Sequence, residues 1–285
     1  MKVLALVASP RRLGNCEIIA REILGALPEG TERAMIRLTE LKIETCRACY
    51  ACLPAGKNCV IADDLAFLLA KVREADAVAI VSPCYFLGSH TTLKLIGDRL
   101  ISVLNEGPQY ANKRCVAATV YGIPGWEGYG REAVLSFARF LHLNVVDDML
   151  VQAANPGEAA RPEVLARARE LAMQLAGMPP SADSGSGETA APEEIRCTGC
   201  GGGLFRLSAA GSVRCAVCGA TGTLNSEGDG CAVRFAAGGL ARFSPQGMAE
   251  HGRRLEEIKE DYLTRRGELH KIRKAWDGPD WWIRP

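Results

Sequence analysis

Twelve cysteines mark the 285-residue chain, and eight of them fall into two regularly spaced groups. The first group is Cys46, Cys49, Cys52 and Cys59, which places four thiols within fourteen residues. Three cysteines at intervals of three can surround one cluster of four irons and four sulfides, and a fourth can reach it from a short loop. Zinc more often takes two separated Cys-x2-Cys pairs. The spacing therefore favours an iron-sulfur cluster, with zinc and redox-active or structural thiols as the alternatives.

The second group consists of two Cys-x2-Cys-Gly turns, Cys197 with Cys200 and Cys215 with Cys218, separated by fourteen residues. The glycine after each pair lets backbone N–H groups point at sulfur, as in zinc knuckles. Residues 195–243 are rich in glycine and poor in apolar mass, so a metal would supply folding free energy that this small core lacks. Four protein ligands leave no open position on the metal. The pattern predicts a zinc ribbon with a structural role.

A third candidate site follows the first apolar run of the chain, where Ser-Pro-Arg-Arg-Leu-Gly-Asn-Cys leads into a helical pattern. The first turn of such a helix offers unpaired N–H groups and the positive end of its dipole to a phosphate. The candidate phosphate-binding residues are Ser9, Arg11, Gly14, Asn15 and Cys16. The segment lacks the glycine patterns of P-loop NTPases and of dinucleotide-binding folds. A plain turn with solvated arginines is the alternative.

Two later apolar runs end in segments that combine aromatic residues with glycine and proline, residues 82–89 and 121–126. Freed backbone amides there can hydrogen-bond the edge of a flat tricyclic ring, and aromatic side chains can cover its face. The candidate ring-binding residues are Pro83, Cys84, Tyr85, Phe86, Gly88, Tyr121, Gly122, Gly125 and Trp126. The alternative is that these aromatics cap the core of the sheet.

These sites must be positioned by alternating strands and helices. Short runs rich in Val, Ile, Leu and Ala predict strands at 2–8, 33–38, 77–82, 114–121 and 145–152. Amphipathic patterns between them predict helices at 15–27, 63–74, 89–104, 128–142 and 162–176, with Asp63 and Asp64 in the first turn of the second and Ser89 or Thr91 capping the third. The alternation predicts an α/β fold, a doubly wound five-stranded parallel sheet in the order 2-1-3-4-5. All four candidate loops in residues 1–178 then leave its carboxyl edge.

The chain divides into four predicted parts: a nucleotide-binding domain at 1–178 with the cysteine loop 46–59 inserted, a linker at 179–194, the ribbon at 195–243, and a helix at 244–285. Met248, Leu255, Tyr262, Leu269 and Trp276 recur every seven residues along that helix. The stripe is expected to pack on the ribbon, the first domain or a second subunit.

Composition excludes several classes of protein. Hydrophobic residues make up 48% of the chain, enough for a sizeable core. Thirty-four Lys and Arg against 33 Asp and Glu leave a net charge of +1, so nucleic-acid binding is not expected. No apolar run approaches the length of a membrane span, and no signal-peptide cleavage site follows the first strand. We expect a cytoplasmic protein without membrane contact.

The combination of ASPRRLGNC, SPCYFLGSHTTLKLIGDR and the cysteine run between them resembles the NADPH-dependent FMN reductase branch of flavodoxin-like proteins, and within it the iron-sulfur flavoproteins. The resemblance covers residues 1–178. It implies that Ser9, Arg11, Asn15 and Cys16 bind the FMN phosphate, that 83–88 and 122–126 face the isoalloxazine ring, and that the cysteine run holds a 4Fe-4S cluster. Cys16 stands where the family usually has Thr or Ser. Lys94, Asp98 and Arg99 also match the family's helix.

The function that this resemblance implies is electron transfer from a reduced donor, ferredoxin or NAD(P)H, to a small-molecule or protein acceptor through FMN and the cluster, in a homodimer or tetramer. One alternative is an NAD(P)H-dependent FMN, quinone or small-molecule reductase in which the cysteine loop is structural. Another is a redox-sensing protein that uses the zinc ribbon to recognise a partner.

Overall fold

The computed structural model describes residues 1–54, 56–104, 106–110, 112–124, 126–178, 194–227, 230–236 and 242–274. Gly125, Trp276 and nearly all of the predicted linker, residues 179–193, lie outside the described residues.

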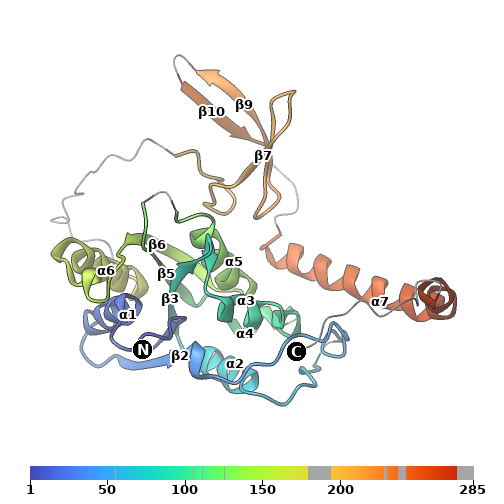
Figure 1. Ribbon diagram of the computed structural model, residues 1–285, viewed down its shortest axis with the longest axis horizontal. Coiled ribbons are helices and arrows are strands. Elements are labelled where there is room, and N and C mark those ends of the chain that lie inside the picture. Colours follow the sequence, from blue (N-terminus) through green and yellow to red (C-terminus); the bar gives the residue numbers. More distant parts are fainter. Residues whose placement is uncertain are drawn as a thin grey trace.

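A parallel sheet forms the centre of the molecule (Figure 1). Its strands are β1 (Lys2–Val7), β2 (Glu32–Arg37), β3 (Ala77–Tyr85), β5 (Arg114–Tyr121) and β6 (Asn144–Gln152). They pair in the order β2-β1-β3-β5-β6, every neighbour parallel. The predicted order 2-1-3-4-5 is confirmed, because β5 and β6 are the fourth and fifth parallel strands. A short antiparallel strand that was not predicted, β4 (Gly88–Ser89), pairs with the end of β3.

Helices cover both faces of this sheet, because alternate side chains of its strands are apolar on both sides. Val3 and Ala5 of β1 pack in the cluster that includes α1 (Asn15–Gly25) and α6 (Pro162–Leu175). Leu4 and Leu6 pack in the opposite cluster. That second face is covered by α2 (Leu65–Glu74), α3 (Thr91–Gly97), α4 (Gly107–Tyr110) and α5 (Gly130–Phe140). The chain also forms three short 3-10 turns among the described residues, η1 (Leu38–Glu40), η2 (Leu100–Val103) and η3 (Glu158–Ala160).

The predicted helix 89–104 is broken, and its predicted caps are wrong. The chain forms α3, then η2, with Arg99 between them turned into the interior. His90 caps α3, since its Nδ1 accepts the amide of Thr92 at 3.1 Å. Neither Ser89 nor Thr91 does so. A single ideal helix over 89–104 would move the Arg99 side chain away from its interior contacts with Asp63 and the carbonyl of Glu44.

The second helix begins at Leu65 and not at 63. The carboxylate of Asp63 accepts the amide of Glu44 at 2.8 Å, and that of Asp64 accepts the amide of Lys42 at 2.7 Å. Both acids therefore join the preceding loop to the start of α2 instead of lying within its first turn. These bonds bring the two ends of the cysteine loop, residues 44 and 63, together.

The ribbon is an antiparallel sheet in the order β10-β9-β8-β7. Its strands are β7 (Phe205–Leu207), β8 (Ser212–Cys215), β9 (Thr221–Glu227) and β10 (Gly230–Phe235). Its first knuckle is attached to α5: Arg131 donates to the carbonyl of Gly201 at 3.1 Å, and Arg139 donates to that of Cys200. The ribbon is therefore anchored on the parallel-sheet domain by backbone contacts.

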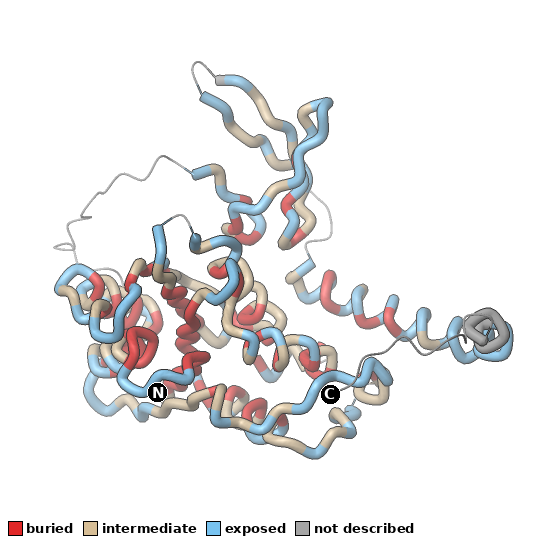
Figure 2. Tube along the Cα trace, in the orientation of Figure 1, coloured by how far each residue is buried: buried red, intermediate tan, exposed pale blue. Residues whose placement is uncertain are grey.

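The terminal helix, α7 (Pro245–Lys274), packs only at its inner end. Met248 and Leu255 are buried in a small cluster with Leu53 of the cysteine loop and Leu104. Tyr262 is 50% exposed, and residues 256–268 are exposed to solvent apart from the half-buried Lys259 (Figure 2). The predicted stripe thus packs on the first domain through its first two positions. Although α7 is thirty residues long, no helix in the described ranges is apolar and long enough to cross a membrane.

Leu255→Ala is expected to lower the free energy of unfolding by about 2 to 3 kcal/mol, because the change removes buried methyl groups and leaves a cavity against Leu53. Urea denaturation followed by circular dichroism measures this. Leu263→Ala on the same helix is the control, since Leu263 is 51% exposed and its loss should cost about 0.5 kcal/mol or less. Equal losses in the two variants would show that α7 is not anchored at its inner end.

Candidate functional site

A cavity of about 420 Å³ opens at the carboxyl edge of the parallel sheet. Three loops that are far apart in sequence meet around it, those after β1, β3 and β5. The predicted residues that line it are Ser9, Arg11, Asn15, Cys16, Pro83, Cys84, Tyr85, Phe86, Tyr121, Gly122 and Trp126. Ala153 and Ala154 after β6 complete the wall, and sequence reasoning missed them. Gly14 and Gly88 do not line the cavity; Gly14 lies in the turn before α1, and Gly88 lies in β4.

The loop after β1 makes a tight turn into α1. Leu13 has a φ of 52°, and a Cβ on Gly14 would lie 2.9 Å from the Cβ of Arg11, so this position needs glycine. The hydroxyl of Ser9 accepts the amide of Arg11 at 3.3 Å. The turn leaves the first amides of α1 without helical partners at the cavity, where they can donate to an anion.

A buried ion pair that sequence reasoning missed holds this turn in place. Arg37 at the end of β2 donates to the carbonyls of Ser9, at 2.9 Å, and Arg11, at 3.2 Å. Its Nη2 lies 2.5 Å from the carboxylate of Glu17, whose side chain is 4% exposed. Burial alone would raise the pKa of Glu17, but hydrogen bonds from Arg37, the Leu13 amide and Arg21 lower it to about 2. The pair fixes the backbone of the loop. In the sequence, only an acid in the first turn of α1 together with an arginine at the end of β2 could have indicated this ion pair.

Two predicted phosphate-binding side chains are oriented otherwise. The amide of Asn15 donates to the carbonyls of Ala153, at 3.2 Å, and Asn155, at 2.9 Å, and its oxygen accepts the amides of Gly157 and Ala159. Both of its donor hydrogens are used, so Asn15 ties α1 to the loop after β6. Cys16 is buried, and burial raises the pKa of its thiol to about 12. It therefore remains a neutral core side chain at the edge of the cavity.

The second wall is a two-residue hairpin between β3 and β4. Phe86 and Leu87 occupy its corner with φ of 52° and 64°, the mirror-image turn that suits the twist of paired strands. Non-glycine residues at positive φ are strained by about 1 to 2 kcal/mol each. The turn leaves the Phe86 side chain fully exposed at the mouth of the cavity.

The third loop is locked to this hairpin. A Cβ on Gly128, which has a φ of 55°, would lie 2.3 Å from the carbonyl oxygen of Leu87. The amide of Tyr129 donates to that same carbonyl at 2.7 Å, and the thiol of Cys84 donates to the carbonyl of Glu127 at 3.2 Å. The hairpin and residues 126–129 are therefore held together as one wall of the cavity. Trp126 is 63% exposed beside Phe86 at the mouth.

The cysteine loop leaves the same edge of the sheet, after β2. Ala48 and Tyr50 have φ of 49° and 54°, so the backbone reverses between successive cysteines. Cys46 and Cys49 are exposed, and Cys52 and Cys59 are half-buried. Burial, and then the charges of the other three sulfurs, raise the pKa of Cys52. Cys52 therefore lies within electrostatic range of all three other thiols.

The two cysteine groups differ in their spacing. The ribbon sulfurs all lie within 4.8 Å of one another and are buried, with Cys197 and Cys218 at 3.5 Å and Cys200 and Cys215 at 3.6 Å. A single tetrahedral ion at about 2.3 Å from each sulfur requires such a spacing. Among the described residues, the loop sulfurs form no group that close. In a four-iron cluster each sulfur binds a different iron, so a wider spacing is compatible with it.

The ribbon knuckles show the geometry that their glycines predict. Gly201 and Gly219 both have positive φ, 67° and 82°.

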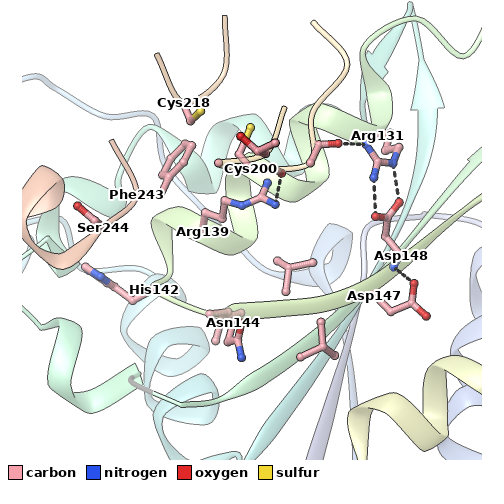
Figure 3. A pocket seen from close by; sticks show the side chains of 16 residues that line it. Arg131, Arg139, His142, Asn144, Asp147, Asp148, Cys200, Cys218, Phe243 and Ser244 are labelled. Carbon is pink, nitrogen blue, oxygen red and sulfur yellow. Dashed lines mark hydrogen bonds and ion pairs between the residues drawn. The ribbon is translucent and has the colours of Figure 1, made fainter. Parts of the chain in front are cut away.

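A separate cavity of about 690 Å³ lies between this knuckle region and the edge strand β6 (Figure 3). In it Arg131 forms a two-pronged pair with Asp148 at 2.6 Å while also contacting the ribbon backbone. No sequence pattern connected α5 with the ribbon.

Glu17→Gln is expected to lower the free energy of unfolding by about 3 kcal/mol at pH 7, because it removes a carboxylate whose pKa falls from 4.5 to about 2 on folding. A depressed carboxylate stabilises the fold above its unfolded pKa and loses this effect as pH falls through the folded one. The difference from the unmodified chain should therefore shrink between pH 5 and pH 2, as measured by urea denaturation at each pH. Glu22→Gln is the control, since its pair with Arg169 is more exposed and should contribute about 1 kcal/mol or less. A difference that is independent of pH would contradict this account.

Comparison with known proteins places this geometry in a family. The model of the NADPH-dependent FMN reductase family matches residues 1–155. The chain is 40% identical over 114 residues to an iron-sulfur flavoprotein of Methanocaldococcus jannaschii, a match that covers 40% of this chain and 58% of that protein. It is 31% identical over 146 residues to an iron-sulfur flavoprotein of Methanosarcina thermophila, covering 50% of this chain and 74% of that one.

A solved structure of a flavone reductase superposes with a TM-score of 0.78 at 21% identity, over 100% of both chains. This likeness shows a shared fold that includes the ribbon and the terminal helix. Because the family model matches more than half of the chain, and one relative is aligned over nearly three quarters of its length, the chain belongs to the NADPH-dependent FMN reductase family, which comprises flavin-dependent oxidoreductases, and within it to the iron-sulfur flavoproteins.

Proposed function

We propose that this protein is an FMN- and iron-sulfur-dependent oxidoreductase that passes electrons from ferredoxin or NAD(P)H to a small-molecule or protein acceptor. The observation that carries the proposal is a cavity at the carboxyl edge of the sheet that joins an anion-binding turn to an aromatic wall, in a chain whose loop after β2 carries four thiols. Flavin exchanges electrons singly or in pairs and a four-iron cluster exchanges one at a time, so the two together interconvert the two modes. The protein's part is to hold both groups and to set their environment.

The cavity supports FMN as its occupant. Its volume of about 420 Å³ falls in the usual range for small-molecule sites. The turn at 9–16 would hold the phosphate through the first amides of α1 and the guanidinium of Arg11. The backbone of the hairpin and of Gly122 would contact the ring edge, with Tyr85 and Trp126 beside its face. The side chain of Asn15 takes no part, because its hydrogen bonds are used within the protein.

Sulfur spacing supports different metals at the two cysteine groups. The loop of Cys46, Cys49, Cys52 and Cys59 suits a 4Fe-4S cluster, whose sulfurs need not approach as closely as those around one ion. The buried ribbon group suits a structural zinc. Bound zinc would hold the knuckle that Arg131 and Arg139 contact, and so would keep the ribbon on α5.

A second candidate function is the reduction of a small aromatic acceptor, with the cysteine loop structural. The exposed side chains of Phe86, Trp126 and Ile123 at the cavity mouth favour it, because a planar substrate can stack on such a surface. The same exposed residues would also suit contact with a second subunit in a homodimer or tetramer, as would Tyr262 and Leu263 on α7.

Analysis of protein purified without oxygen tests the leading proposal. We expect about four irons and one FMN per chain, together with about one zinc. Absorption spectra and metal analysis measure all three. Iron near zero, with FMN present, would remove the electron-transfer proposal and leave a flavin reductase.

Cys49→Ala separates the two candidate functions in the same preparation. In electron transfer, the loss of one cluster ligand should abolish transfer to a one-electron acceptor, while FMN remains bound and reducible. In the second function, turnover of a small acceptor should be unchanged after correction for folded protein. Cys231→Ala is the matched control, since Cys231 is an exposed cysteine outside both groups.

Gly128→Ala is expected to reduce the FMN content several-fold, because its Cβ would collide with the carbonyl of Leu87 and separate the two loops of the cavity wall. Flavin released on denaturation, measured by fluorescence per folded chain, gives the content. Gly30→Ala is the control: Gly30 also has a positive φ, 77°, but its Cβ would meet nothing within 4 Å. It should cost about 1 kcal/mol of stability and no FMN. Normal FMN content in Gly128→Ala would place the flavin away from this wall.

A further inference from the structure

Arg99 is a buried cation at the base of the cysteine loop. Its side chain is 1% exposed, and the residue lies between α3 and η2. Its Nη2 lies 3.2 Å from the sulfur of Cys59, and its Nη1 contacts the carboxylate of Asp63 and, at 3.1 Å, the carbonyl of Glu44. The guanidinium thus joins both ends of the loop and touches one of its four sulfurs directly.

Asp63 keeps this cation in place. Its side chain is 4% exposed and accepts the amides of Glu44, at 2.8 Å, and Leu65, at 3.1 Å. Burial alone would raise the pKa of Asp63, but Arg99 and these amides lower it, so the group is an anion. The pair removes two charges from water, and the Nε of Arg99 has no hydrogen-bond partner. Such an arrangement is costly compared with apolar packing and is weak evidence for stability alone.

The geometry gives the cation a direction. Nη1 of the guanidinium faces Asp63 and the carbonyl of Glu44. Nη2 lies 3.2 Å from the sulfur of Cys59 and 3.5 Å from the carbonyl of Ile61, so the carboxylate holds the fork with one nitrogen beside the sulfur. N–H donors to a ligating sulfur, and fixed positive charge beside it, stabilise the more negative state of a metal cluster. Arg139 of α5, by contrast, donates to the backbone carbonyl of Cys200 and not to a sulfur.

We propose that Arg99, oriented by Asp63, is a positioning residue that raises the reduction potential of a cluster bound through Cys59. This inference rests on the proposed function. One-electron reduction adds one negative charge to the cluster and its thiolates, and no bond or proton changes. The electron comes from the reduced flavin in the protein, or from dithionite in the test. The guanidinium stabilises the reduced form more than the oxidised form, and Asp63 moderates this effect by its opposite charge.

The test is the midpoint potential of the cluster in the anaerobic full-length protein, followed by electron paramagnetic resonance during titration with dithionite. Arg99→Gln should give a lower midpoint potential than the unmodified chain, and Arg99→Lys, which keeps the charge, should recover most of the shift. Asp63→Asn should give a higher potential, because it removes the moderating anion. Arg131→Gln is the matched control: it breaks another arginine-carboxylate pair, less buried than that of Arg99 and Asp63, that touches no loop sulfur, and it should leave the potential unchanged.

Opposite shifts in the Arg99 and Asp63 variants support the inference. A purely structural clamp would lower cluster content in both variants and would not move the potential in opposite directions. If Arg99→Gln loses its iron, the midpoint potentials of Asp63→Asn and Arg99→Lys test the inference instead. A midpoint potential in Asp63→Asn equal to or below that of the unmodified chain overturns the inference. Failure of the proposed function is seen separately, as absence of iron in the unmodified chain before any potential is measured.

Discussion

Strands β1 and β3 lie at the centre of the sheet and are covered by helices on both faces, and the candidate site depends on this arrangement. Side chains such as Ala5 on one face and Leu4 on the other are both fully or almost fully buried. Parallel pairing directs the carboxyl end of every strand to one edge, so the loops that follow must meet there. The cavity lined by the loops after β1, β3 and β5 lies at that edge for this reason. The cysteine loop starts there, after β2, and extends toward the opposite edge, where Cys52 lies beside Arg73 and Glu106.

Three buried arginine-carboxylate pairs attach irregular segments to this scaffold. Arg37 with Glu17 holds the turn at the phosphate end of the cavity, Arg99 with Asp63 closes the cysteine loop, and Arg131 with Asp148 anchors the ribbon. In each pair the arginine also donates to backbone carbonyls of the segment concerned. The planar five-donor fork can bind a carboxylate and carbonyls together, which lysine cannot do with one nitrogen. These loops are therefore held by polar contacts where they have little apolar surface to bury.

The terminal parts of the chain contact the cysteine loop and α5. Leu53 of the cysteine loop is buried by Met248 and Leu255 of α7, so the helix covers the loop at its inner end. The ribbon rests on α5, whose first turn follows the cavity-lining loop after β5. The cysteine loop is thus fixed by Arg99 from the domain side and by α7 from the other, which limits the positions that its sulfurs can take.

Local patterns in the sequence determined the parallel sheet, its strand order, the ribbon turns and the loops that would line the cavity, because strand periodicity, glycine position and cysteine spacing depend on neighbours in the chain. Tertiary structure alone decided the break at Arg99 and the use of Asn15 inside the protein. Each depends on a partner tens of residues away, such as Cys59 for Arg99 or Ala153 for Asn15. A buried polar side chain must satisfy its charge or hydrogen bonds wherever packing places a partner, and the spacing of residues along the chain does not contain that information.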